Sequence, residues 1–130
     1  MVTVGLRANG LTVQIPGDRD ALGRLEVDDN LKVAGSGDVY ATGDVAHARV
    51  DDAGNYALMS CQHARSMGKY AGLNVVRDLM GAASRPYRQA DYTTCHDLRN
   101  FGAVFTMRWN RDVQTTGAEA KKRKAMINTQ

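Results

Sequence analysis

The run from Val39 to Gly43, "VYATG", constrains the fold more than any other stretch of the chain. Short, nearly continuous apolar runs are typical of parallel strands that are covered on both faces. The run leads into Asp44, and a strand that only leaves a core has no packing reason to end beside a carboxylate. In open α/β sheets, ligands bind at the carboxyl ends of the strands. Asp44 therefore either caps the next turn or accepts a hydrogen bond from a ligand hydroxyl, such as that of a sugar alcohol.

A long helix is predicted to follow a loop at 47–56 and to cover about 58–80. Ser60 is a candidate N-cap, and Gly81 is suited to end the helix. Glycine inside a helix costs about 1 kcal/mol relative to alanine, so Gly68 and Gly72 are expected to have a packing reason. The small and apolar residues that recur on one predicted face are Ala64, Met67, Gly68, Ala71, Gly72, Val75 and Leu79.

The N-terminus of this helix is expected to lie near the same ligand as Asp44. It carries a partial positive charge and unpaired N–H groups, which would stabilise negative charge on a reduced flavin ring. Its first turn would contain Met59, Ser60, Cys61 and Gln62. Gln62 is either a donor to the ring edge or an exposed polar residue. Gly43 has no Cβ, so a ligand can approach the backbone there.

The rest of the chain is predicted to contain short strands and loops. A strand is expected at 2–5, another strand or an extended segment at 11–15, and a hairpin at 24–33 that turns at Asp29–Asn30. After a linker at 82–90, strands are expected at 91–98 and 102–109, followed by a helix over about 117–127. The pattern predicts an α/β unit up to residue 82 and the start of an α+β unit over 83–130. Both ends of the sequence suggest a piece of a longer chain.

The low cysteine content favours a reducing, cytoplasmic setting. No run is apolar enough for a spanning helix, and the two cysteines, Cys61 and Cys95, are too few for a disulfide scaffold. The net charge is +3, and Lys121–Lys124 is a run of four basic residues. This run is either a solvated helix face or a contact for an acidic surface.

Four ordered segments resemble the FAD-dependent pyridine-nucleotide oxidoreductases, and within them the NADH dehydrogenase (type II-like) group. "VYATGDVA" resembles the second FAD motif of that family. "TVGLRANG" resembles the passage from the NAD(P)H domain, at residues 1–10, back to the FAD domain. "GRLEVDDNLKV" resembles the segment before the motif, and "ALMSCQHARSMGKYAGLNVVRDLMG" the helix after it. "YTTCHDLRNFGAVFT" and "GAEAKKRKAMIN" also read like that group.

The resemblance implies a Rossmann-like flavoprotein in which hydride passes from NAD(P)H to FAD, and electrons then pass to a quinone-like acceptor. It implies that Asp44 binds a ribityl hydroxyl of FAD, with Gly43 and Val45 beside it. It places Ser60, Cys61, Gln62 and His63 at the flavin. In the family the C-terminal region can face the membrane, so the basic helix would serve peripheral attachment to the inner face.

The sequence also departs from the family. No GxGxxG loop is present, so the chain alone is expected to be inactive. Arg99 and Arg108 stand where the nearest relatives are expected to have glycine. No redox-active cysteine pair is present, which argues against disulfide chemistry.

Several alternatives remain open at this point. Cys61 is either a reactive thiol at a helix N-terminus or, as we favour, a small residue packed in the core or under the flavin. His47 is expected in a solvent-exposed loop rather than at the flavin. Zinc binding is disfavoured, because Cys61 and His63 on a helix, like adjacent Cys95 and His96 on a strand, point in different directions.

The alternative function is a non-catalytic module whose basic C-terminal helix contacts an acidic surface, with membrane favoured over nucleic acid. An exposed sheet edge would also allow pairing with a second copy.

Overall fold

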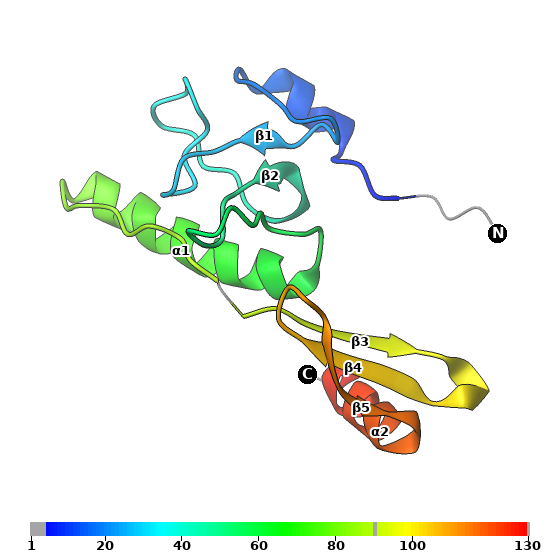
Figure 1. Cartoon of the computed structure of the whole chain (residues 1–130). Coiled ribbons are helices and arrows are strands. Elements are labelled where there is room, and N and C mark those ends of the chain that lie inside the picture. The colour runs from blue at the N-terminus through cyan, green and yellow to red at the C-terminus, as the bar shows by residue number, and fades with distance from the viewer. Residues whose placement is uncertain (1–4, 90, 130) are drawn as a thin grey trace. The chain divides into compact units, whose positions relative to one another are not determined.

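The computed structural model describes residues 5–89 and 91–129 and shows mixed helix and strand content. The chain forms two compact units, divided after Gln89 (Figure 1). We call the part before this boundary unit 1 and the part after it unit 2. The predicted strand at 2–5 lies almost entirely outside the described residues.

Unit 1 contains little regular sheet. Strands β1 (Leu25–Glu26) and β2 (Ala46–His47) are two residues long and pair in parallel. Two 3-10 turns, η1 (Gly10–Gln14) and η2 (Gly43–Val45), and one long helix, α1 (Cys61–Leu79), complete it. Unit 1 is therefore held together largely by loops packed around one helix.

The prediction of a buried parallel strand at 39–43 is wrong. This stretch makes an antiparallel bridge, Lys32 to Tyr40, with the segment before it. The Val33 amide donates to the Val39 carbonyl at 2.8 Å, and the Ala41 amide donates to the Leu31 carbonyl at 3.1 Å. The parallel pairing lies a few residues later, in β2. The backbone groups at 39–41 thus bond to the neighbouring segment at 31–33 in a local hairpin, and not to a distant parallel strand.

The hairpin predicted at 24–33 is confirmed in its centre. Val27 and Val33 form an antiparallel bridge, and the turn lies at Asp29–Asn30. The Asp28 carboxylate accepts hydrogen bonds from the amides of Asn30 and Lys32, at 2.8 and 2.9 Å. This Asx-type bonding stabilises the turn locally.

The strand predicted at 11–15 is wrong, because the preceding asparagine starts a 3-10 turn. The Asn9 side chain accepts a hydrogen bond from the Leu11 amide at 2.9 Å, and the Thr12 hydroxyl donates to the Asn9 carbonyl at 3.0 Å. Leu11 and Val13 are 66% and 73% exposed. Local side-chain bonding therefore outweighs the alternating apolar pattern.

Helix α1 has both of the predicted ends. Ser60 is the N-cap, and its side chain accepts from the His63 amide. At the other end Gly81 has a φ of 66°, in the left-handed region. The Gly81 amide donates to the Asp78 carbonyl at 3.0 Å, and the Ala82 amide donates to the Arg77 carbonyl at 2.8 Å. These two bonds form a Schellman motif.

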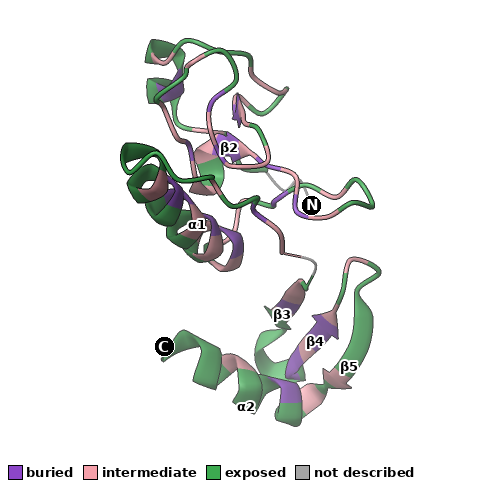
Figure 2. Ribbon diagram, turned by 90° about the vertical axis from the view of Figure 1, so that its left-hand side faces the viewer, coloured by how far each residue is buried: buried purple, intermediate pink, exposed green. Residues whose placement is uncertain are grey.

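The buried face of α1 agrees with the predicted one at Met67 and Ala71 and differs from it elsewhere. It consists of His63, Met67, Ala71 and Asn74, and Figure 2 shows the buried side of the helix opposite an exposed side. Gly68 and Gly72 are exposed, and a Cβ added at either would meet no atom within 4 Å among the described residues. The expected packing reason for these glycines is therefore absent from the described part of the chain.

One amide side chain ties α1 to two loops. Asn74 is fully buried, and its Nδ2 donates to the carbonyls of Asn30 and Arg85 at 3.0 and 2.8 Å. Its Oδ1 accepts from the Arg85 amide at 2.8 Å. The bonds fix the hairpin turn and the linker after α1 against the helix.

The linker is held further by Tyr87, which is fully buried and packs edge-on against Tyr70 with ring centroids 5.4 Å apart. Burial raises the pKa of the Tyr87 hydroxyl to about 12. The Tyr87 amide donates to the Asp29 carbonyl at 2.7 Å. Hydrogen bonds from Arg49 and Arg88 lower the pKa of the Asp29 carboxyl to about 2. The turn at Asp29 is thus held by a backbone hydrogen bond from Tyr87 and by two arginine side chains.

Unit 2 is a three-stranded antiparallel sheet covered by one helix. Strands β3 (Thr93–Asp97), β4 (Ala103–Met107) and β5 (Asp112–Thr116) lie in that order, and helix α2 (Gly117–Asn128) packs against them (Figure 1). The core consists of Ala103, Phe105 and Ala120. The strands predicted at 91–98 and 102–109 and the helix after them are confirmed, whereas β5 was not predicted.

Two arginines of unit 2 occupy glycine-like backbone positions. Arg99, in the turn η3 (Arg99–Phe101), has a φ of 55°, and Arg108 has a φ of 64°. At both positions the family resemblance led us to expect glycine in the nearest relatives. The left-handed region is unfavourable for a residue with a side chain, so the fold retains a conformation that these residues do not prefer.

Replacing Asn74 by alanine is expected to destabilise unit 1 by about 2 to 4 kcal/mol, because it removes all three hydrogen bonds of a fully buried side chain to the backbone of Asn30 and Arg85. Urea unfolding of the 130-residue chain measures this. Lys69→Ala, an exposed change on the same helix, should alter stability by less than about 0.5 kcal/mol. Equal effects of the two changes would contradict this role of Asn74.

Replacing Gly68 and Gly72 by alanine is expected to stabilise the chain by about 0.5 to 1 kcal/mol each. The added methyl groups meet open space, and alanine loses less backbone entropy in a helix. The same urea measurement tests this. A loss of stability would mean that this side of α1 is packed in solution.

Candidate functional site

The two segments that the sequence predicts at a cofactor lie against each other in unit 1. Turn η2 packs on the first turns of α1. Gly43 has a φ of 70°, and a Cβ built on it would lie 3.6 Å from the Ala64 Cβ. Glycine is suited to this left-handed conformation, whereas the added Cβ would make only an ordinary contact with Ala64. The structure therefore brings Gly43, Asp44 and Val45 to the N-terminal end of α1.

The Asp44 carboxylate is exposed at this junction. Among residues 5–89 and 91–129 it has neither a hydrogen bond nor an ion pair. The N-cap of η2 is Thr42, and no side chain caps that turn. The capping alternative for Asp44 is thus not realised, and its oxygens can accept hydrogen bonds from a ligand.

The first turn of α1 is ordered by Ser60 and His63. The His63 amide donates to Ser60 Oγ at 3.4 Å, and this oxygen lies 2.9 Å from His63 Nδ1. His63 is fully buried, and burial lowers the pKa of its imidazole below the ordinary value of 6.5. His63 therefore holds the start of α1 from the buried side of the helix and does not face solvent.

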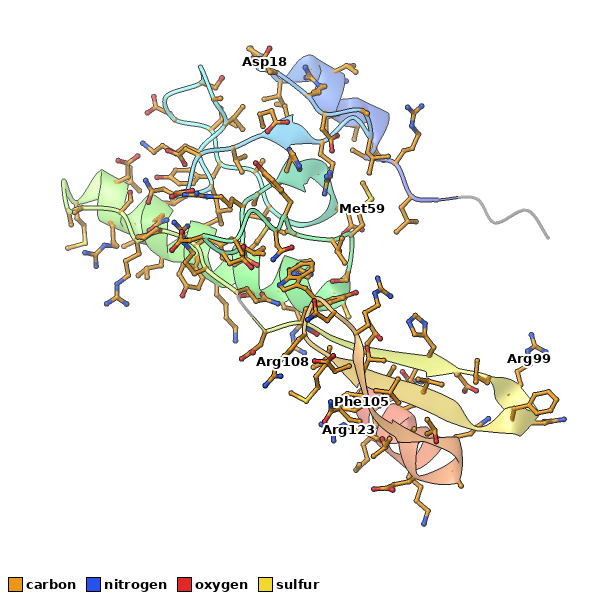
Figure 3. All side chains as sticks on the ribbon, viewed as in Figure 1. Asp18, Met59, Arg99, Phe105, Arg108 and Arg123 are labelled. Atoms are coloured by element: carbon orange, nitrogen blue, oxygen red, sulfur yellow. The ribbon has the colours of Figure 1, made fainter. Side chains whose placement is uncertain are left out.

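The neighbouring residues differ from their expected exposures. Cys61 is exposed, so it does not pack in the core, whereas its packing under a flavin stays a prediction. Gln62 is half-buried, so it is not the exposed polar residue of the alternative interpretation. The helix start also presents backbone N–H groups that have no acceptor within the helix. Figure 3 labels Met59 in the loop before this turn.

A buried arginine that the sequence analysis did not single out supports this loop. Arg24 is 8% exposed, and its Nη2 lies 2.7 Å from the Asp20 carboxylate. Its Nη1 donates to the Ala57 carbonyl at 2.8 Å, three residues before the N-cap. Arg24 thus ties the loop leading into α1 to the strand β1. In the sequence, only its position after Gly23 and before the apolar Leu25 could have drawn attention to Arg24.

The expectation of a solvent-exposed loop for His47 is wrong. His47 lies in β2, its Nδ1 is 2.8 Å from the Glu26 carboxylate, and its ring stacks on Tyr56 at 4.1 Å. The reason is the parallel register, which places Glu26 beside His47. This pairing depends on residues far apart in sequence.

Neither metal binding nor a membrane span is indicated by the described residues. Within 5–89 and 91–129, no three His, Cys, Asp or Glu side chains gather in a way that could hold a metal ion. No helix within these ranges is long and apolar enough to cross a bilayer.

Two relatives are similar to nearly the whole chain. It is 50% identical over 125 residues to the NADH dehydrogenase-like protein Rv1812c of Mycobacterium tuberculosis strain H37Rv. It is equally similar to the NADH dehydrogenase-like protein MT1860 of Mycobacterium tuberculosis strain CDC 1551. The match covers 96% of this chain but only 31% of each relative. No family model matches the chain. The names of these relatives agree with the NADH dehydrogenase part of the resemblance, whereas its FAD part stays a prediction.

The buried imidazole predicts a pH dependence of stability. Because the folded-state pKa of His63 lies below 6.5, the unfolded chain binds more protons as the pH falls below that value. The stability contributed by the neutral imidazole is present above pH 6.5 and is lost as the pH falls through the folded pKa. Urea unfolding at a series of pH values measures this dependence. The free energy of unfolding should change less with pH in His63→Gln, and as much as in the unchanged chain in the exposed control His96→Gln.

Proposed function

We propose that this chain is part of an FAD-dependent NAD(P)H dehydrogenase. Residues 1–82 would be the C-terminal part of its Rossmann-like FAD-binding domain, and residues 83–130 the start of its α+β C-terminal domain. The observation that carries the proposal is the exposed Asp44 carboxylate, held beside the N-terminus of α1 by the Gly43 turn. The names of the two relatives support the dehydrogenase activity.

The residues at this junction suit a flavin nucleotide. Asp44 offers an acceptor for a ribityl hydroxyl, and the turn at Gly43 leaves the backbone open to close approach. The N–H groups at the start of α1 suit the electron-rich edge of a flavin ring. Cys61 and Gln62 lie in that first turn, and Ser60 and His63 hold it in place.

These residues would bind and orient the cofactor and would carry no covalent step. When bound, FAD supplies hydride acceptance from NAD(P)H and electron delivery to a quinone-like acceptor. The partial positive charge of the helix start would favour the added negative charge of the reduced state. Arg24 would keep the loop before α1 in position through the Ala57 carbonyl.

The 130-residue chain by itself is proposed to be inactive, because its sequence contains no GxGxxG loop for a pyrophosphate. The other half of the cofactor site would come from outside this sequence.

Contact of unit 2 with the inner face of a membrane is also part of the proposal. Residues 90–130 contain seven Lys or Arg and four Asp or Glu, which gives +3. Residues 1–89 contain ten of each, so the whole net charge resides in unit 2. A surface with this charge favours acidic partners.

The role of Asp44 is tested in a chimera in which the 130-residue chain replaces the matching segment of Rv1812c. The chimera is expected to show the visible absorption of an oxidised flavin. Asp44→Asn should weaken FAD binding about tenfold or more, because a charge-assisted hydrogen bond is worth about 1.5 to 3 kcal/mol. Flavin release on dilution, followed by fluorescence, gives the affinity.

Asp38→Asn is the matched control, since Asp38 is an exposed aspartate in the loop just before the 39–43 stretch. It should leave FAD binding unchanged. A folded chimera without flavin, or equal effects of the two changes, would overturn the proposal.

A further inference from the structure

A groove of about 410 Å³ in unit 2 is lined by residues of α2 and by one residue of β5. It combines two cationic side chains, one acidic side chain, a hydroxyl and two apolar side chains. Its lining residues are Thr115, Glu119, Lys122, Arg123, Met126 and Ile127. The proposed flavin site uses none of these residues.

Arg123 is held in this groove by an aromatic ring. Its guanidinium carbon lies 3.9 Å from the centroid of Phe105, and Figure 3 shows the two labelled residues close together. Glu119, one helical turn away, makes no ion pair with Arg123 within the described residues. A guanidinium stacked on a ring keeps its N–H edge available for a planar anion.

A buried hydroxyl lies in the same groove. Thr115 pairs with Phe105 across β4 and β5, so its side chain is on the side of the sheet that faces α2. Thr115 Oγ1 is buried and has no hydrogen-bond partner within the described residues. A buried polar atom without a partner is rare and costs stability, so it needs an explanation.

The other end of the groove is apolar. Met126 and Ile127 lie in the last turn of α2 and are 60% and 45% exposed. A cationic end with a hydroxyl donor and an apolar end suit a ligand that is anionic at one end and aliphatic at the other.

We propose that this groove binds an anionic amphiphile, with one carboxylate or phosphate group on an aliphatic chain. The acid oxygens accept hydrogen bonds from Thr115 Oγ1 and the Arg123 guanidinium. The aliphatic chain covers Met126 and Ile127. Lys122 adds positive charge beside the acid group of the ligand. The proposal does not depend on the flavin site, and it would stand if the chain carried no flavin.

The test titrates decanoate into the 130-residue chain below its micelle concentration and follows binding by amide NMR shifts. Decanoate and decyl phosphate are expected to shift residues of α2 and β5. Decanol and inorganic phosphate, which each carry half of the chemistry, should bind at least about tenfold more weakly. Vesicles with and without phosphatidylglycerol then distinguish a bilayer source of the anion from a free amphiphile.

Thr115→Val separates a ligand site from a structural defect. Removing a buried hydroxyl without a partner should raise the melting temperature of the free chain, while weakening decanoate binding about fivefold. Arg123→Gln should weaken binding about tenfold, provided that circular dichroism shows a folded chain. Lys124→Gln is the matched control, because Lys124 belongs to the same basic run but does not line the groove.

The proposal would be overturned if decanol bound as well as decanoate. It would also be overturned if Lys124→Gln weakened binding as much as Arg123→Gln, since binding would then follow overall charge. An unchanged affinity in Thr115→Val would remove the hydroxyl from the site and contradict the assigned geometry.

Discussion

The side-chain amide of Asn74 is the interaction on which unit 1 depends most. The parallel pair β1–β2 is only two residues long, so sheet hydrogen bonds cannot hold the loops in place. Asn74 instead bonds to backbone groups of Asn30 and Arg85, and so it joins the helix to the hairpin turn and to the linker. Buried polar groups specify one arrangement when all of them are satisfied, because any other arrangement leaves them without partners.

The same mode of stabilisation positions the candidate site. Arg24 bonds to the Ala57 carbonyl, and Ser60 and His63 order the first turn of α1. Neutral and paired groups are therefore used inside, whereas the Asp44 carboxylate remains exposed at the junction. The satisfied polar groups thus fix the junction at which the Asp44 carboxylate lies, which supports the proposed binding role of Asp44.

Local patterns predicted some elements well and others poorly. The ends of α1 could be predicted because Ser60 and Gly81 act within one helical turn of their own position. The buried side of α1 could be predicted only at Met67 and Ala71, because apolar periodicity did not mark the polar His63 and Asn74 as buried residues. The stretch at 39–43 was predicted as a parallel strand, and its apolar composition does not distinguish a parallel partner from a hairpin partner.

The sequence by itself determined the ends of helix α1, through Ser60 and Gly81, and the hairpin turn at Asp29–Asn30. These depend on capping side chains and turn chemistry within a few residues, which act whatever the rest of the chain does. Only the tertiary structure decided which distant groups meet. It placed Gly43 on Ala64, and it set Arg123 over Phe105 and not beside Glu119. Such contacts depend on how whole elements pack, and packing is settled by the shape and burial of all the residues together.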